Sequence, residues 1–378
     1  MHWRGERHAV EQLPASMSFA ARSAVEAVAP WAADHEYRLD LEDSGRVLLV
    51  TRQEASTERA LGLVERTIAW FDEQIPAPSS SSVRTYRRVE APTTGAAVDS
   101  GAVPEDPDDD APWKVAGFGA NQGRSRSVPE TQTRWGADDV VPDTQTAIFF
   151  VVRDERDYKK LLAFVAKLQP YLKSWTRAAR KQQGFALQAP LAGAYIELAE
   201  GQEEWNADNE LVNRLTQLLS LRRFGPLPNW LQQGIAWNAE VALLGAIYCF
   251  PFREEFVWAT EHTGWDRAVE VLVSRREDAV EPKEFLGWKR GRYDDEAAKL
   301  SWAGVRLLLE KPAGELSAIA RTLAEFRDHD NRIHETETSW KRDPAYVLPV
   351  EDQRAILESY LGGEVWQEWT QRFRSFAD

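Results

Sequence analysis

The chain has one cysteine, Cys249, in 378 residues. A single thiol excludes an intramolecular disulfide and any zinc site built from several cysteines. Because Cys249 lies in the apolar run AIYCF, we expect a buried thiol without redox chemistry. The chain also lacks an unbroken apolar run of about 20 residues, so no membrane-spanning helix is predicted.

The sequence also lacks a signal-like apolar stretch and has few cations, and these two features bear on where the protein is located and what it binds. Residues 1–25 contain no apolar stretch of the kind that marks a secretory signal, so a cytoplasmic protein is predicted unless translation starts further upstream. Positive charge is also scarce, because 46 Lys and Arg stand against 60 Asp and Glu, for a net charge of −14. This balance argues against nucleic acid as a partner, since a phosphate-binding surface needs clustered cations.

Common catalytic motifs are missing as well. No P-loop and no G-x-S-x-G occurs, and the glycine-rich piece at 117–123 follows no predicted strand, so it is not a credible phosphate site. A Ser–His–Asp triad stays open, although no residue pattern indicates one. The only histidine cluster is DHDNRIHE, which contains His329, Asp330, His334 and Glu335. His329 and His334 are five residues apart, a spacing that does not place both rings on one helix face. We therefore expect solvated surface, with a metal-binding loop as the alternative.

Apolar periodicity predicts alternating strands and helices over much of the chain. Strands are expected at 37–41 and 46–52, which form a hairpin, and at 147–152 and 191–198. A basic helix is expected from Pro170 to about residue 183. Other helices are predicted over about 19–28, 61–75, 154–168, 209–224, 228–244, 265–275, 294–309, 313–326 and 364–376.

Residues 77–145 interrupt this pattern. They open with APSSSS and pass through PEDPDDD, and they show no sustained periodicity. Such a composition predicts a disordered acidic insert, either a solvated loop without a role or a docking segment for a basic partner.

After this insert, the sequence NELVN places several polar residues on one predicted helix. Asn209 and Asn213 stand at i and i+4 on one helix face, with Glu210 between them. Gln233 follows 20 residues after Asn213, within the sequence WLQQGIA.

These residues, together with the strand AYIEL and the segments FGPLPNWL and GIAWNAE, resemble the peptidase MA-like gluzincin metallopeptidases from about residue 37 to 376, apart from the insert. In that family H-E-x-x-H supplies two zinc ligands and a general base, and a Glu on the next helix supplies the third ligand. The resemblance implies that Asn209, Asn213 and Gln233 stand at former ligand positions and Glu210 at the base position. It also implies that the strand at 191–198 is a sheet edge that binds extended peptides.

Amides are weak, neutral ligands for Zn²⁺, so the replacement of all three ligands predicts a lost zinc site and no cofactor. Without a metal-activated water, Glu210 is a vestigial general base. We expect the amides of Asn209, Asn213 and Gln233 to hydrogen-bond one another and Glu210.

The prediction is therefore an α+β protein with the gluzincin (zincin-like) fold, a small mixed sheet with helices followed by a mostly helical C-terminal half. Its parts are an N-terminal extension (1–36), an α+β domain (37–76 and 146–250), the insert (77–145) and a helical subdomain (251–378). The predicted function is that of an inactive pseudopeptidase, which binds a peptide or protein in the inherited cleft or acts as a scaffold. Members of the family that the sequence resembles are often exported, whereas this sequence predicts a cytoplasmic protein. One alternative is an active metal-dependent hydrolase with atypical ligands and Glu210 as base. Another is a domain that presents the insert to a partner.

Overall fold

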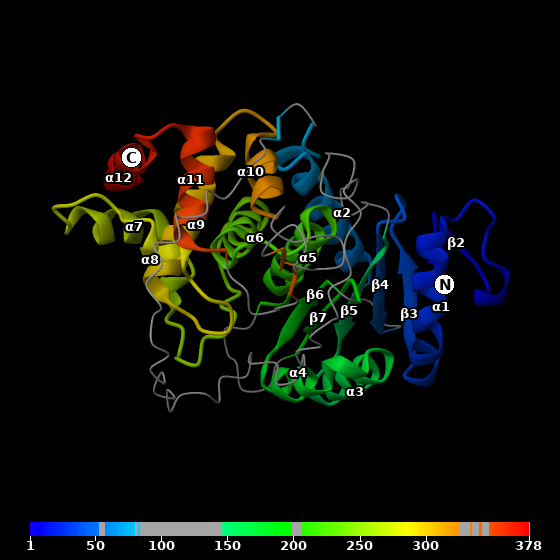
Figure 1. Ribbon diagram of the computed structural model, residues 1–378. Helices are drawn as coiled ribbons and strands as arrows, with labels where there is room; N and C mark the ends of the chain where they lie inside the picture. The colour runs from blue at the N-terminus through cyan, green and yellow to red at the C-terminus, as the bar shows by residue number, and fades with distance from the viewer. Residues whose placement is uncertain are drawn as a thin grey trace, which may run out of the picture.

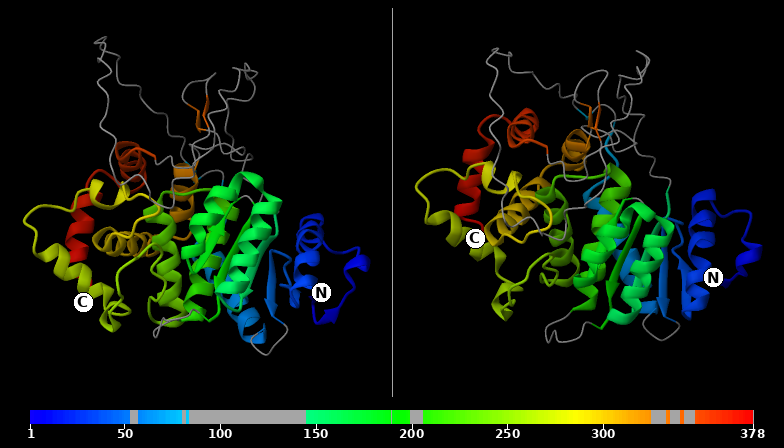
Figure 2. Two further views of the ribbon diagram at one scale, coloured as in Figure 1. Left: turned by 90° about the horizontal axis from the view of Figure 1, so that it is seen from below. Right: turned by 60° about the horizontal axis from the view of Figure 1, so that its bottom comes forward.

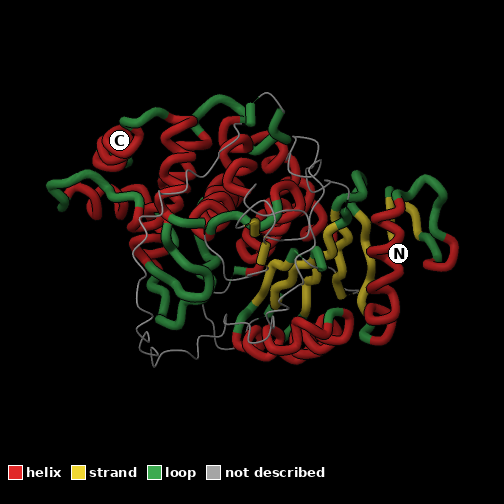
Figure 3. Tube along the Cα trace, viewed as in Figure 1, coloured by secondary structure: helices red, strands yellow, loops and turns green. Residues whose placement is uncertain are grey.

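The computed structural model describes residues 1–52, 57–79, 82–83, 145–188, 190–198, 206–324, 333–334, 340–341 and 348–377. Almost all of the predicted insert therefore lies outside the described residues, and so do His329, Asp330 and Glu335. Within the described parts the protein is of the α+β class, as predicted, with a mixed sheet in one half and helices filling the other (Figures 1 and 3).

The main sheet has the strand order β2-β1-β3-β4-β5-β7-β6. Strands β4, β5 and β7 run parallel, while β3 and β6 run antiparallel to their neighbours β4 and β7. The strands are β1 His2–Trp3, β2 Glu6–Arg7, β3 Tyr37–Leu41, β4 Val47–Arg52, β5 Ala147–Val152, β6 Gly184–Leu187 and β7 Ala192–Ile196; β8 Ile333–His334 and β9 Trp340–Lys341 form a separate pair. The hairpin and the strands near 147–152 and 191–198 are confirmed, whereas β1, β2 and β6 were not predicted.

The middle strands are buried on both faces, which explains why their sequences are apolar without interruption. In β4, Val47 and Leu49 join one apolar cluster, while Leu48 and Val50 join the other. Helices α1, α3 and α4 cover the face of Leu48, and α2 and α5 cover the opposite face (Figures 1 and 2). The sheet is therefore the middle of three layers.

The helices match most of the predicted ones. They are α1 Phe19–Asp34, α2 Thr57–Gln74, α3 Glu155–Leu168, α4 Lys173–Ala178, α5 Ala207–Phe224, α6 Asn229–Leu244, α7 Trp265–Ser274, α8 Lys283–Leu286, α9 Asp295–Leu309, α10 Glu315–Ala324, α11 Val350–Leu361 and α12 Val365–Arg374. Helices α8 and α11 were not predicted. Among the helices described, none combines the length and apolar character that a membrane span requires.

Helix α1 corrects one expectation, because it continues through Pro30 to Asp34 instead of ending near Val28. Proline removes one helical hydrogen bond, which normally favours an end. Here the continuation buries Trp31, which is 5% exposed and contacts Phe150 of the sheet. Burial of this large ring offsets the lost hydrogen bond.

The ends of the predicted insert meet the C-terminal end of α5. Arg223 donates to the carbonyl oxygen of Ile75, and Nε of Arg222 donates to that of Gln145 at 2.6 Å. Neighbouring arginines on one helix thus fix the chain on both sides of the insert.

Helix α5 is the central helix of the molecule. Every residue from Asn209 to Phe224 is buried, between the sheet on one side and α2 and α6 on the others. Helix α6 in turn crosses α9 closely at Gly234, where an added Cβ would lie 2.6 Å from the carbonyl oxygen of Ser301. The polar side chains of α5 therefore have to find their partners inside the protein.

Candidate functional site

The helix that carries the candidate residues begins with a local cap. Asn206 accepts a hydrogen bond from the backbone N–H of Asp208, and the helix ends at Gly225, whose φ is 78°. Asn209, Asn213 and Gln217 follow at intervals of four residues and so lie along one face of α5. The next helix, α6, begins directly after Pro228, which occupies the N-cap position and not, as predicted, the first turn.

Asn209 and Asn213 converge on one carboxylate that sequence reasoning missed. Nδ2 of Asn209 donates to Oε2 of Glu240 at 2.7 Å, and Nδ2 of Asn213 donates to Oε1 at 2.7 Å. The backbone N–H groups of Tyr248 and Cys249 donate to the same Oε2, at 2.8 and 3.2 Å. Glu240 is completely buried, and this burial raises its pKa to about 8 although the four hydrogen bonds favour the ionised form.

Gln217 connects this carboxylate to the third predicted ligand position. Its Nε2 donates to Oδ1 of Asn213 at 2.6 Å and to Oε1 of Gln233 at 3.4 Å. The three predicted positions therefore belong to one network, in the order Asn209, Glu240, Asn213, Gln217, Gln233. The expectation that Asn209, Asn213 and Gln233 bond one another directly is wrong, because Glu240 and Gln217 stand between them.

Glu210 is also not part of this network, contrary to the prediction. Its Oε2 accepts a hydrogen bond from Nε of Arg214 at 3.1 Å, and the two side chains are only 5% and 8% exposed. Burial alone would lower the pKa of Arg214, but the carboxylate of Glu210 beside it raises this pKa above its ordinary value. Glu210 is thus held in a buried ion pair with Arg214, which lies one helical turn further along α5.

Cys249 lies close to this ion pair. The thiol is fully buried, as predicted, and burial raises its pKa well above the ordinary value. Protonated buried thiols are poor nucleophiles, so this environment favours a structural role for Cys249.

The ion pair gives a testable expectation for stability. We expect Arg214→Met to lower the free energy of unfolding by about 3 kcal/mol, because it leaves Glu210 buried and unpaired. The double variant Glu210→Gln/Arg214→Met should recover most of this loss, and a urea titration of both variants measures the difference. Equal losses in the two variants would show that packing of the arginine stem, and not the charge pair, stabilises this region.

The strand that packs over the Glu210–Arg214 ion pair is not the one that was expected at the edge of the sheet. The predicted edge strand, at 191–198, is β7, which pairs with β5 on one side and β6 on the other. The edge is β6, whose residue Gly184 faces Arg214, since an added Cβ would lie 3.2 Å from Nε of Arg214. An edge strand therefore does lie over α5, but it is the strand one position further out.

All members of the network are nearly inaccessible to solvent. The exposed fractions of Asn209, Asn213, Gln217, Gln233 and Glu240 are 1%, 0%, 5%, 2% and 0%. The groups do not fit zinc, because the amides of Asn209 and Asn213 present N–H donors, not lone pairs, to their common partner. Within the described parts of the chain, no group of three or more His, Cys, Asp or Glu side chains could hold a metal ion.

Glu240 had a recognisable position in the sequence. It follows Gln233 by seven residues, two helical turns, and so lies on the same face of α6. The segment GIAWNAE was part of the family resemblance, but a single glutamate there could equally have been a solvated surface residue. Only the packing of α5 against α6 reveals that it faces both asparagines.

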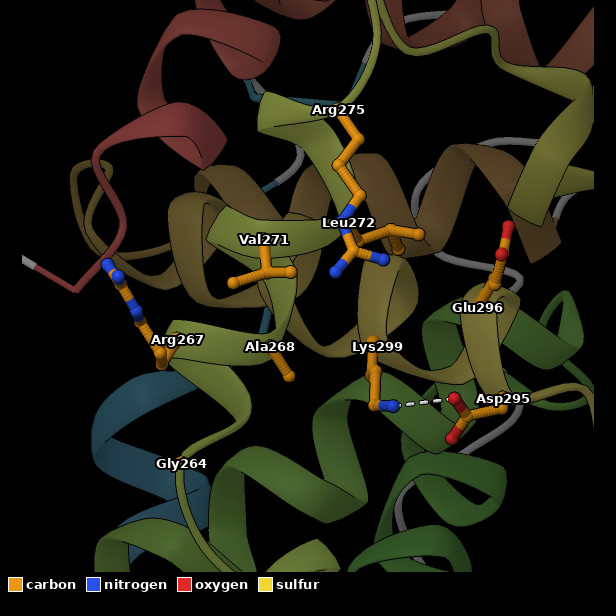
Figure 4. A pocket seen from close by; sticks show the side chains of 9 residues that line it. All are labelled: Gly264, Arg267, Ala268, Val271, Leu272, Arg275, Asp295, Glu296 and Lys299. Carbon is orange, nitrogen blue, oxygen red and sulfur yellow. Dashed lines mark hydrogen bonds and ion pairs between the residues drawn. The ribbon is translucent and has the colours of Figure 1, made fainter.

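A surface groove of about 430 Å³ lies elsewhere, between α7 and α9 (Figure 4). Ala268, Val271 and Leu272 supply apolar surface, and Lys299 pairs with Asp295 at 2.5 Å on one side. None of the predicted site residues contributes to this groove, which is therefore separate from the network of α5 and α6.

No family model matches the chain, and no curated protein matches it significantly.

Proposed function

We propose that the protein is a catalytically inactive relative of the gluzincin metallopeptidases, in which a buried hydrogen-bond network has replaced the zinc site. The observation that carries the proposal is that Asn209 and Asn213 both donate to Glu240. In zinc sites a histidine ligand almost always donates its second ring N–H to a carboxylate, a backbone carbonyl or a water molecule. Under the proposal, Glu240 is the remnant of such a supporting carboxylate, since it now pairs with the side chain at position 209. The proposed former ligand positions themselves hold amides.

The surroundings of Glu210 support the absence of catalysis. A general base must reach the proton of a water molecule bound next to the substrate. Glu210 instead accepts a hydrogen bond from Arg214 and is 4% exposed. These two features count against the alternative of an active hydrolase with Glu210 as base, since both would have to change before water or substrate could reach the carboxylate.

The proposed role is the binding of a peptide or protein segment, or scaffolding. The edge of the sheet at β6 is the inherited feature that fits an extended peptide, because a sheet edge offers unpaired backbone groups. In β6, Ala186 and Leu187 are partly exposed, whereas Gly184 and Phe185 are buried. A partner that adds a strand would therefore pair with the C-terminal half of β6.

The proposal is tested on the wild-type protein with added Zn²⁺, Co²⁺ or Mn²⁺. We expect no stoichiometric metal by elemental analysis after dialysis, and casein hydrolysis no faster than with Glu210→Gln. The variant is isosteric, so it controls for a contaminating peptidase. Tightly held metal at one equivalent, or hydrolysis that Glu210→Gln abolishes, would show that the active-hydrolase alternative is right.

A further inference from the structure

One segment of this acidic protein is free of acidic residues. Residues 158–183 contain seven Lys and Arg and no Asp or Glu, in a chain whose net charge is −14. The segment comprises most of α3, the turn Pro170–Leu172, α4 and the turn Ala179–Lys181. Charge is therefore distributed unevenly, and the net value hides a local concentration of cations.

The cations of this segment all point to solvent. Lys159 and Lys160 have partners on the same helix, Glu155 at 3.5 Å and Asp157 at 2.9 Å. The other five form no ion pair with any residue that the structure describes. We call these five the basic patch: Lys167, Lys173, Arg177, Arg180 and Lys181, all of them exposed.

Apolar side chains lie among these cations. Leu168 and Tyr171 are 43% and 42% exposed, and Pro170 between them is exposed as well. They join the end of α3 to the start of α4, in the layer that faces the viewer in the left view of Figure 2. On the inner side of the same layer, Leu172 and Ala179 pack into the core beneath the sheet. The layer is thus anchored on the protein and presents cations together with apolar groups outward.

We propose that the basic patch, with Leu168 and Tyr171, docks the protein on an anionic lipid surface. Clusters of four to eight Lys and Arg attract anionic headgroups, and exposed apolar side chains beside them insert into the interface. A duplex or single strand of nucleic acid would use the cations but would leave Leu168 without a role. The acidic remainder of the chain does not prevent docking, because charges further away than about 8 Å are largely screened at physiological salt.

In the proposed orientation, the lipid surface would contact neither the α5 side of the sheet nor the C-terminal helices. The basic patch lies on the face of the sheet that α3 and α4 cover, whereas α5 and its network lie on the opposite face. Docking through α3 and α4 would therefore leave the α5 side and the C-terminal helices directed away from the lipid.

The test is co-sedimentation of the full chain with vesicles of phosphatidylcholine alone and of phosphatidylcholine mixed with phosphatidylserine. We expect binding to the mixed vesicles only, weakened by added salt. Changing the five patch cations to Gln should weaken partitioning by roughly fivefold per cation. A control variant with the same net charge changes five exposed cations elsewhere to Gln and should bind like wild type: Arg267, Arg275, Lys283, Lys289 and Lys311.

The variant Leu168→Ser/Tyr171→Ser distinguishes lipid from other polyanions. Weaker vesicle binding at unchanged thermal stability would support insertion of these side chains. Unchanged vesicle binding in this variant would overturn the proposal, and so would tighter binding to a DNA oligonucleotide than to the mixed vesicles. Equal losses in the patch variant and in the control variant would also overturn it, because net charge alone would then explain the binding.

Discussion

The triple variant Asn209→His/Asn213→His/Gln233→Glu is expected to bind zinc at least about a thousandfold more tightly than the wild-type protein. The reason is geometric: positions 209 and 213 lie one turn apart on α5, and Gln233 already belongs to the same network. Two imidazoles and a carboxylate are ligands that Zn²⁺ prefers, whereas the present amides are not. Isothermal titration measures the affinity, and refolding in the presence of zinc gives access to the buried site. The melting temperature should rise with bound zinc.

A substitution of Glu240 in the triple variant tests the proposed zinc site more specifically. In the triple variant it would accept a hydrogen bond from the new histidine at position 209, as it now does from Asn209. Adding Glu240→Gln should therefore weaken zinc binding by about 10- to 100-fold. A control places the second histidine at position 217 and leaves Asn213 unchanged, which separates the two imidazoles by two turns. Zinc binding as weak as wild type in the triple variant, or as tight in the control, would contradict the proposed ancestry.

Zinc alone should not give the triple variant peptidase activity. Glu210 would still be paired with Arg214, and its carboxylate would remain nearly buried. The triple variant would thus bind metal without catalysis, and the ion pair would be the next feature to remove.

The sequence predicted the scaffold of the candidate site more accurately than its contacts. Helices α5 and α6 begin and end close to the expected residues, because Gly225 and the following prolines stop one helix and start the next. Strand β5 matches the predicted range 147–152, since an uninterrupted apolar run of six residues can be buried on both faces. These signals are local, and a single sequence contains them.

The partners of the polar side chains depend on packing between distant segments. Asn209 and Glu240 are 31 residues apart, and no pattern along the chain shows that they face each other. Strand β6 has only four residues and follows a basic helix, so it carries too little periodicity to be predicted. The basic helix was predicted from the local sequence, whereas the net charge of −14 is an average that does not show the exposed cations of α4 and the turn after it. The predicted insert stays a prediction, since nearly all of it is outside the described residues.

The stability of the protein is expected to fall between about pH 4.5 and pH 8 because of Glu240. Burial raises the pKa of this carboxyl from 4.5 to about 8, so in this window the folded chain binds a proton that the unfolded chain has released. The contribution is complete below pH 4.5 and is lost as the pH rises through 8, up to about 5 kcal/mol. Glu240→Gln removes this titration. Relative to wild type, the variant should therefore gain stability steadily as the pH increases through this window.

Urea unfolding of both proteins across this pH range measures the effect, with the exposed Glu255→Gln as the control that should follow wild type. The network can accept the glutamine, because Asn213, Gln217 and Gln233 can each turn their amides and so reverse the direction of the hydrogen-bond chain. A difference between Glu240→Gln and wild type that stays constant with pH would mean that Glu240 remains ionised throughout. Its four hydrogen bonds would then outweigh the cost of burial, and the network would be a permanently charged one.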